Sequence, residues 1–71
     1  MKYALLIMLC SLEYNACLPP LEGGFYKTWY ECADNGYTKS LKILKDIDAR
    51  VFNENKYHIA FRCGELEDDH L

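Results

Sequence analysis

The stretch that decides the fold lies near the N-terminus and reads Tyr3-Ala-Leu-Leu-Ile-Met-Leu-Cys10. Both of its alternating faces are apolar, with Leu5 and Ile7 on one face and Leu6 and Met8 on the other. This pattern is typical of a strand that is central in its sheet or covered on both sides. We therefore expect a strand over residues 3–10. The run is far shorter than the roughly 20 apolar residues of a membrane-spanning helix, so we expect no membrane span.

The same run follows Lys2 and so also resembles a short secretory leader, and Asn15-Ala16-Cys17 faintly resembles a lipoprotein cleavage site. Glu13 and Tyr14, however, stand where a leader would have small residues. Cleavage before Cys17 would leave one helix and one strand, which are too little to close a core. We interpret the run as a retained structural strand.

The next segment, residues 11–16, is polar and favours a turn. A turn centred on Glu13 and Tyr14 would place Cys10 opposite Cys17, where cross-strand Cβ atoms come close enough for a disulfide. A short hairpin strand is then expected near residues 16–19, and Pro19-Pro20 would stop further ladder pairing because proline lacks the N–H donor.

The central part of the chain predicts one long helix, about residues 29–53. Thr28 and Glu31 form a capping box, in which each side chain accepts a hydrogen bond from an unpaired amide at the helix start. Apolar residues then recur at steps of three and four and predict a single stripe facing the core. The stripe consists of Trp29, Ala33, Tyr37, Leu41, Leu44, Ile47 and Val51, while Lys39, Lys42, Lys45 and Arg50 lie off it on a solvated face.

A second strand is expected over residues 57–63, where Ile59 and Phe61 alternate with His58 and Arg62. Residues 65–71 are predicted to be an acidic, mobile tail. The order strand, helix, strand suggests a right-handed crossover with the two strands parallel. For 71 residues the expectation is a single α+β domain, with a two- to three-stranded sheet packed on one long helix and stapled by disulfides.

The chain contains four cysteines, Cys10, Cys17, Cys32 and Cys63. No two of them have the close spacing of zinc ligands, and an even number in a small chain favours two disulfides over reduced thiols. In the expected crossover all four would meet at one end of the domain, and the favoured pairing is Cys10–Cys17 with Cys32–Cys63. Four cysteines allow three pairings, and the sequence leaves all three open.

Disulfides would indicate an oxidising environment, such as the periplasm, the extracellular space or a virion surface. Reduced thiols would instead indicate the cytoplasm of a host cell.

No catalytic, cofactor or metal site is predicted. His58 stands about 16 Å along the expected strand from Cys63, too far for a cysteine–histidine pair. Gly23-Gly24 belongs to no phosphate-binding motif. The net charge of −3 argues against nucleic-acid binding, which normally requires a basic excess.

The strongest binding signal is aromatic. Residues 25–30 read Phe-Tyr-Lys-Thr-Trp-Tyr, and tyrosine and tryptophan are the side chains most enriched at binding hot spots. We expect the partner-binding surface to include Phe25, Tyr26, Trp29, Tyr30 and Tyr14. The alternative is that these rings fill a thin core.

Several short elements together resemble a family of small cysteine-containing proteins encoded by marine bacteriophages. These elements are the opening Met-Lys-Tyr-Ala-Leu-Leu-Ile-Met-Leu-Cys-Ser, Cys17-Leu-Pro-Pro, Trp29-Tyr-Glu-Cys32, Gly36-Tyr37 and Phe61-Arg-Cys63. The resemblance covers nearly the whole chain and implies a phage origin. The family has no assigned activity, so no functional residue is carried over from it.

The expected function is therefore that of a non-enzymatic phage protein that binds a host or phage protein and has some capacity for self-association. The alternative is a structural component of the virion, such as a capsid decoration or filament subunit.

Overall fold

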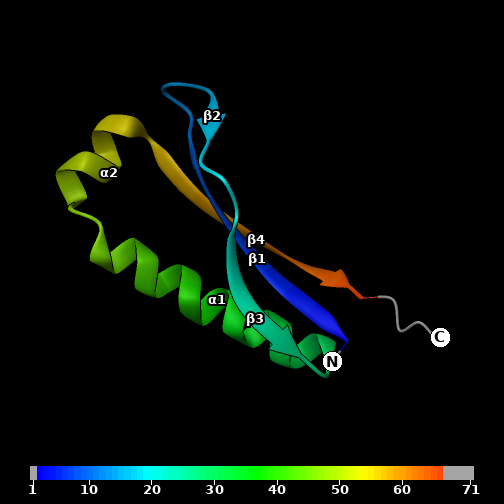
Figure 1. Ribbon diagram of the computed structural model, residues 1–71. Helices are drawn as coiled ribbons and strands as arrows, with labels where there is room; N and C mark the ends of the chain where they lie inside the picture. The colour runs from blue at the N-terminus through cyan, green and yellow to red at the C-terminus, as the bar shows by residue number, and fades with distance from the viewer. Residues whose placement is uncertain (1, 67–71) are drawn as a thin grey trace.

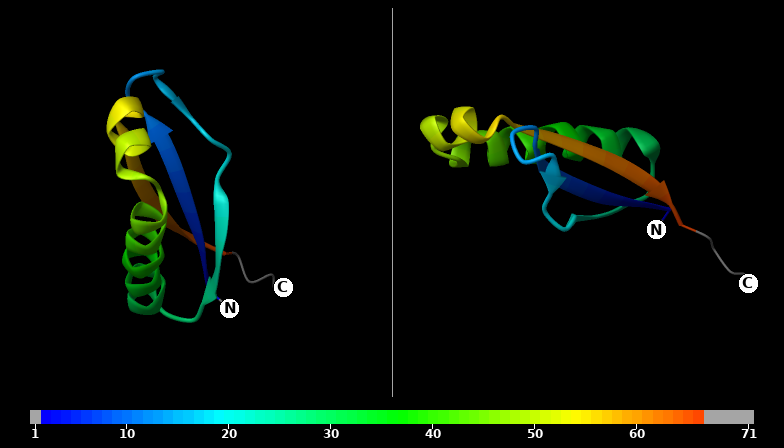
Figure 2. Two further views of the ribbon diagram at one scale, coloured as in Figure 1. Left: turned by 90° about the vertical axis from the view of Figure 1, so that its left-hand side faces the viewer. Right: turned by 90° about the horizontal axis from the view of Figure 1, so that it is seen from above.

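The protein is a four-stranded antiparallel sheet covered on one face by two helices, as seen in a computed structural model that describes residues 2–66 (Figures 1 and 2). The elements in chain order are β1 (Tyr3–Ser11), β2 (Ala16–Cys17), β3 (Leu21–Tyr26), α1 (Trp29–Asp46), α2 (Ala49–Asn55) and β4 (Tyr57–Glu65). The predicted α+β class is confirmed. The predicted tail over residues 65–71 begins inside β4 at Glu65, and its residues 67–71 lie outside the described part of the chain.

The apolar strand β1 is the centre of the sheet, as its sequence predicted. β4 pairs with it along its whole length, from Tyr3 opposite Glu65 to Ser11 opposite Tyr57. The other edge of β1 is shared by two short strands that pair one after the other, β2 near its end and β3 near its start. Every other described strand therefore hydrogen-bonds to β1, so the apolar stretch occupies the centre of the sheet.

The expected parallel arrangement of the first and last strands is wrong, because β4 runs antiparallel to β1. The prediction placed only a short hairpin strand near residues 16–19 between β1 and α1, and β2 confirms it, whereas the chain continues back along β1 as the unpredicted strand β3. This return carries the chain to the start of β1 before α1 begins (Figure 1). The helix then travels to the far end of the sheet, and β4 comes back from there.

The sequence did not predict β3, because its two glycines indicate a turn. The register with β1 shifts between Leu5 and Leu6, and Gly24 has a φ of 110°, which favours glycine. A Cβ at Gly23 would overlap the side chain of buried Leu5. The glycines thus form a bulge that lets β3 lie directly against the core, where the sequence pattern indicated only a turn.

The predicted helix start is confirmed and its length is not. The Thr28 hydroxyl accepts a hydrogen bond from the Glu31 N–H at 3.0 Å, and the Glu31 carboxylate accepts one from the Lys27 N–H at 3.3 Å. The helix of residues 29–53, however, is broken after Asp46, because Ile47 is extended. Asp48 then caps a new helix through its Oδ1, which accepts from the Arg50 N–H at 2.8 Å. Aspartate favours such a cap over a helix interior.

The predicted apolar stripe of α1 does not face the core. The helix meets the sheet through a neighbouring line that contains Cys32 and Gly36, both buried, and half-buried Ile43. Trp29 and Tyr37, by contrast, are 60% and 70% exposed. The reason is steric: the small residues let the helix approach β4 closely, which the two aromatic rings would prevent.

Two disulfides join the chain in the favoured pairing, Cys10–Cys17 and Cys32–Cys63. They indicate an oxidising, extracellular-type environment. The expectation that all four cysteines meet at one end is wrong, since Cys10 lies opposite His58 in the ladder and Cys63 lies opposite Leu5. The Cys32–Cys63 pairing was predicted correctly despite the wrong topology, because α1 runs antiparallel to β4 in both the expected and the observed arrangement. The start of the helix therefore lies beside the end of the strand.

The core is small. It consists of Leu5, Ile7 and Cys32, with half-buried aromatic and aliphatic residues around them, and the molecule measures only 13 Å along its shortest axis. In the entropy model the Cys32–Cys63 bridge, which spans 31 residues, contributes about 3–4 kcal/mol by constraining the unfolded chain. Neither described helix is long and apolar enough to cross a membrane.

We predict that Gly36→Ala lowers the free energy of unfolding by about 1–2 kcal/mol in urea denaturation. A Cβ at Gly36 would overlap the ring of Phe61, and overpacking of about 1–3 kcal/mol exceeds the gain in helix propensity of about 0.5–1 kcal/mol. Gly64→Ala is the matched control, because the nearest atom to its Cβ is the Ala4 carbonyl oxygen at 4.0 Å. Equal stability of the two variants would contradict the close contact between α1 and β4.

Candidate functional site: exposed aromatic surface

Three exposed aromatic residues lie close together in the chain where β3 leads into α1, and we call Phe25, Trp29 and Tyr30 the aromatic corner. Their exposed fractions are 49%, 60% and 78%. Phe25 lies opposite Ala4 in the ladder, on the face of the sheet away from Leu5 and the helices. Trp29 is the first residue of α1, and its ring packs edge-on against Tyr3 with 5.6 Å between centroids. The corner is thus part of the ordered structure, and none of its three rings belongs to the core.

Tyr26, also predicted to bind a partner, has a different position. It lies opposite Tyr3 and packs against the core cluster. Its hydroxyl donates a hydrogen bond to the Gly23 carbonyl at 2.7 Å. Tyr26 therefore holds the glycine bulge of β3 in place and offers little surface to a partner.

Tyr14 is 71% exposed but lies in the turn between β1 and β2, at the opposite end of the sheet from the aromatic corner. The nine residues of β1 separate the two places by about 26 Å at the usual strand rise. The structure therefore does not bring Tyr14 together with residues 25–30, because β1 and its return strands extend along the full length of the sheet.

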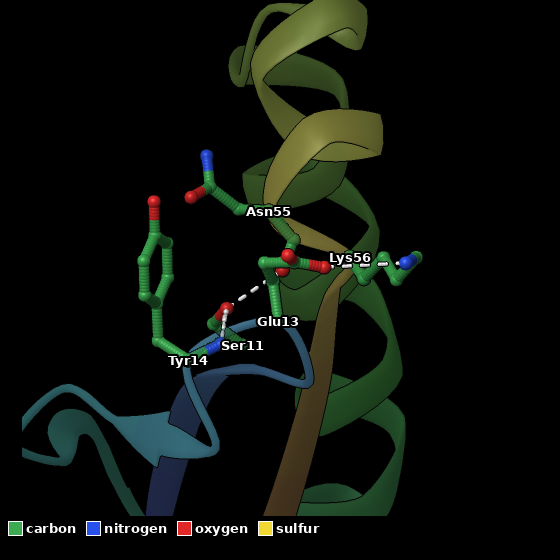
Figure 3. Close-up of polar contacts among 5 residues, drawn as sticks. All are labelled: Ser11, Glu13, Tyr14, Asn55 and Lys56. Atoms are coloured by element: carbon green, nitrogen blue, oxygen red, sulfur yellow. Dashed lines mark hydrogen bonds and ion pairs between the residues drawn. The ribbon is translucent and has the colours of Figure 1, made fainter.

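A polar cluster fixes the turn that carries Tyr14 (Figure 3). The buried Ser11 hydroxyl donates to the Asn55 carbonyl at 2.7 Å and accepts from the Tyr14 N–H at 3.1 Å. Nearby, Lys56 and Glu13 form an exposed ion pair at 3.2 Å. The cluster joins the turn to the junction of α2 and β4, where Lys56 ends the helix with a left-handed backbone.

The aromatic corner offers apolar contact and no reactive group. The carboxylate of neighbouring Glu31 is engaged by the helix cap. All four cysteines are in disulfides, and within residues 2–66 no group of three or more histidine, cysteine, aspartate or glutamate residues is placed to hold a metal ion. The corner is therefore suited to binding another molecule through ring contacts.

A second exposed apolar surface was missed by the sequence analysis. Because α1 sits on Cys32 and Gly36, its predicted stripe lies along one side of the helix and borders a shallow groove beside β4. We call this surface the α1 flank, and it consists of Trp29, Ala33, Tyr37, Leu41 and Leu44. The signal that could have revealed it is the line of small residues, Cys32 and Gly36, next to the stripe.

Comparison with known proteins gives no further guide to the site, since the chain matches no protein-family model, no curated protein and no solved structure.

We predict that Ser11→Ala lowers the free energy of unfolding by about 1 kcal/mol, because the part-buried Tyr14 N–H loses its acceptor and the Asn55 carbonyl keeps only the Glu13 N–H as a donor, at 3.4 Å. The measurement is chemical denaturation followed by Trp29 fluorescence. Ser40→Ala is the matched control, since the buried Ser40 hydroxyl has no hydrogen-bond partner in the described structure and alanine favours the helix. A Ser11→Ala variant as stable as Ser40→Ala would show that the turn is not held by this cluster.

Proposed function

We propose that this chain is a non-enzymatic interaction protein, encoded by a bacteriophage, that binds a host or phage protein through its aromatic corner. The observation that carries the proposal is the exposure of three large rings, Phe25, Trp29 and Tyr30, within six residues at the junction of β3 and α1. Large exposed rings cost solubility, and a group of them on a small domain is typical of a surface that a partner covers.

The rigidity of the corner supports the same function. The cap formed by Thr28 fixes the first turn of α1, and the Cys32–Cys63 bridge ties that turn to β4 only three residues after Trp29. A preorganised surface loses less conformational entropy when it binds. The aromatic side chains add to this advantage, because each has only two torsion angles to order.

The proposed place of action follows from the disulfides. An oxidising environment for a phage product would be the periplasm of the host, the extracellular space or the surface of the virion. If the thiols are reduced in the cell, the protein acts in the host cytoplasm instead. The proposed phage origin rests on the resemblance of the short motifs quoted above.

We predict that Phe25→Ala and Tyr30→Ala each weaken partner binding by at least about tenfold, as expected for hot-spot residues. A photo-crosslinking amino acid at position 30 would first capture the partner during infection, and its affinity for the purified variants would then be measured by calorimetry. Tyr14 is the matched control, because it is similarly exposed but lies at the other end of the sheet. Full binding by both corner variants, or an equal loss on Tyr14→Ala, would contradict the proposed surface.

A virion component is the second candidate, and a specific observation favours it. β4 is nine residues long and, within residues 2–66, pairs only with β1, so one of its edges is available for contacts between subunits. Quantitative mass spectrometry of purified particles should then find this chain at a copy number comparable to that of the coat proteins. Particles that lack the chain would exclude the structural role and leave the interaction protein.

A further inference from the structure

The free edge of β4 is unusually regular. Its register with β1 runs without a shift from residue 57 to residue 65, and the strand contains no proline. Natural sheets normally protect such an edge with a bulge, a proline or a covering element, because its unpaired backbone groups template pairing with another strand. None of these three devices occurs along β4 in the described part of the chain, where the charged residues of the strand are Arg62 and Glu65.

The backbone groups on this edge can be assigned. At the two ends of the ladder, the Leu66 N–H donates to the Lys2 carbonyl at 2.8 Å and the Lys56 carbonyl accepts from Leu12 at 3.1 Å. Even-numbered residues of this segment therefore direct their N–H and C=O groups toward β1. Because these directions alternate along a strand, the odd-numbered residues direct theirs outward. The outward set is Tyr57, Ile59, Phe61, Cys63 and Glu65.

The α1 flank borders this same edge. One groove is lined by Trp29, Ala33 and Tyr37 from the helix and by residues 59–63 from the strand. A second groove continues it along Leu41 and Leu44, and the two share Tyr37 and Ile59. The five residues of the flank carry no charge, and the lysines of α1 lie on its other sides. The open edge and the apolar flank therefore form one continuous surface.

We propose that this surface pairs with its own copy: β4 of one molecule aligns antiparallel with β4 of a second about a two-fold axis that passes between Phe61 and its copy. The two sheets become one continuous sheet, and the two α1 helices lie side by side on the same face. This self-association goes beyond the proposed function and does not depend on it. Only Trp29 belongs to both surfaces.

The register follows from the strand itself. Centring on residue 61 is the only alignment that pairs all five outward residues, with 57 opposite 65, 59 opposite 63 and 61 opposite itself. Five such pairs that exchange two hydrogen bonds each give ten between the chains. On the other face, His58 lies opposite Gly64 and Arg62 opposite Ala60, so no like charges stand directly opposite each other.

The positions of the two α1 helices agree with the same two-fold axis. Tyr37 packs edge-on against Phe61, with 4.8 Å between ring centroids, so the two-fold axis passes near Tyr37. Tyr37 then faces its own copy, and small Ala33 faces Leu41 of the second molecule. Because the five flank residues are uncharged, the two flanks meet without repulsion or a buried unpaired charge. A second copy is therefore complementary to the surface in both its backbone and its side chains.

The size of the surface also suits a dimer. Stable interfaces bury about 800 Å² on each partner. The exposed parts of Trp29 and Tyr37 alone come to roughly 250 Å², at the usual area of an aromatic side chain. Exposed Leu41 and Leu44 and the nine-residue strand edge add to this area.

The test is sedimentation velocity of the oxidised, full-length protein over a wide concentration range. The native chain should form a dimer, and Leu41→Glu should weaken it at least about tenfold by placing a carboxylate against apolar Ala33 of the second copy. Leu41 is 50% exposed in the single molecule, so the variant should fold normally. Leu12→Glu is the matched control, because Leu12 is 65% exposed but lies in the distant β1–β2 turn, and this variant should dimerise like the native chain.

Amide hydrogen exchange tests the register in the same samples. The N–H groups of residues 57, 59, 61, 63 and 65 should exchange at least about tenfold more slowly at high than at low protein concentration. A native chain that stays monomeric would overturn the proposal, whether or not it binds another protein through the corner. A dimer in which these five amides stay unprotected, or which Leu41→Glu leaves intact, would also overturn it, because the contact would then involve another face.

Discussion

The contact between the start of α1 and the end of β4 is the constraint on which the rest of the structure depends. Cys32 is bonded to Cys63, and one turn later Gly36 lies against the ring of Phe61. Together they hold the helix close to the sheet and fix its rotation about its own axis. With this rotation set, the small residues face inward and the neighbouring line of Trp29, Tyr37 and Leu41 is left at the surface. Both exposed apolar surfaces of α1 follow from this one contact.

Local chemistry in the sequence was sufficient to predict the individual elements. The two-sided apolar pattern of β1, the cap at Thr28 and the position of Cys10 opposite Cys17 are each fixed by residues close together in the chain. The topology was not predictable in this way. It depends on whether residues 21–26 pair with β1, and Gly23-Gly24 indicates a turn unless the buried Leu5 beside it is known. The break at Asp48 was equally hidden, since aspartate occurs within helices as well as at their caps.

The candidate site was predicted only in part, and the reason is again the rotation of α1. A helical stripe indicates which residues share a face, but it does not determine which face meets the sheet. Tyr30 was expected at the surface for its residue type, while Trp29, although also named for partner binding, was assigned to the core-facing stripe with Tyr37 and Leu41. Tyr26 was expected at the binding surface, but it packs on the core, and its hydroxyl donates a hydrogen bond to the backbone of the glycine bulge. Side-chain chemistry suggested aromatic contacts, and only the packing decided which rings are available.

A thin domain can expose much apolar surface when other molecules cover that surface. The core of Leu5, Ile7 and Cys32 is too small to shelter every apolar side chain of the sequence, so the disulfides stabilise the fold and the remaining rings stay outside. Pairing through β4 would use Trp29 in the dimer and place Phe25 and Tyr30 of the two aromatic corners at opposite ends, because each corner lies beside the C-terminal end of its own β4 and the strands run antiparallel. Two corners held at a fixed separation can bind a repeated surface with far higher avidity than one. The two proposed roles, an interaction protein and a component of a phage particle, are then compatible, since a particle lattice presents such a repeated surface.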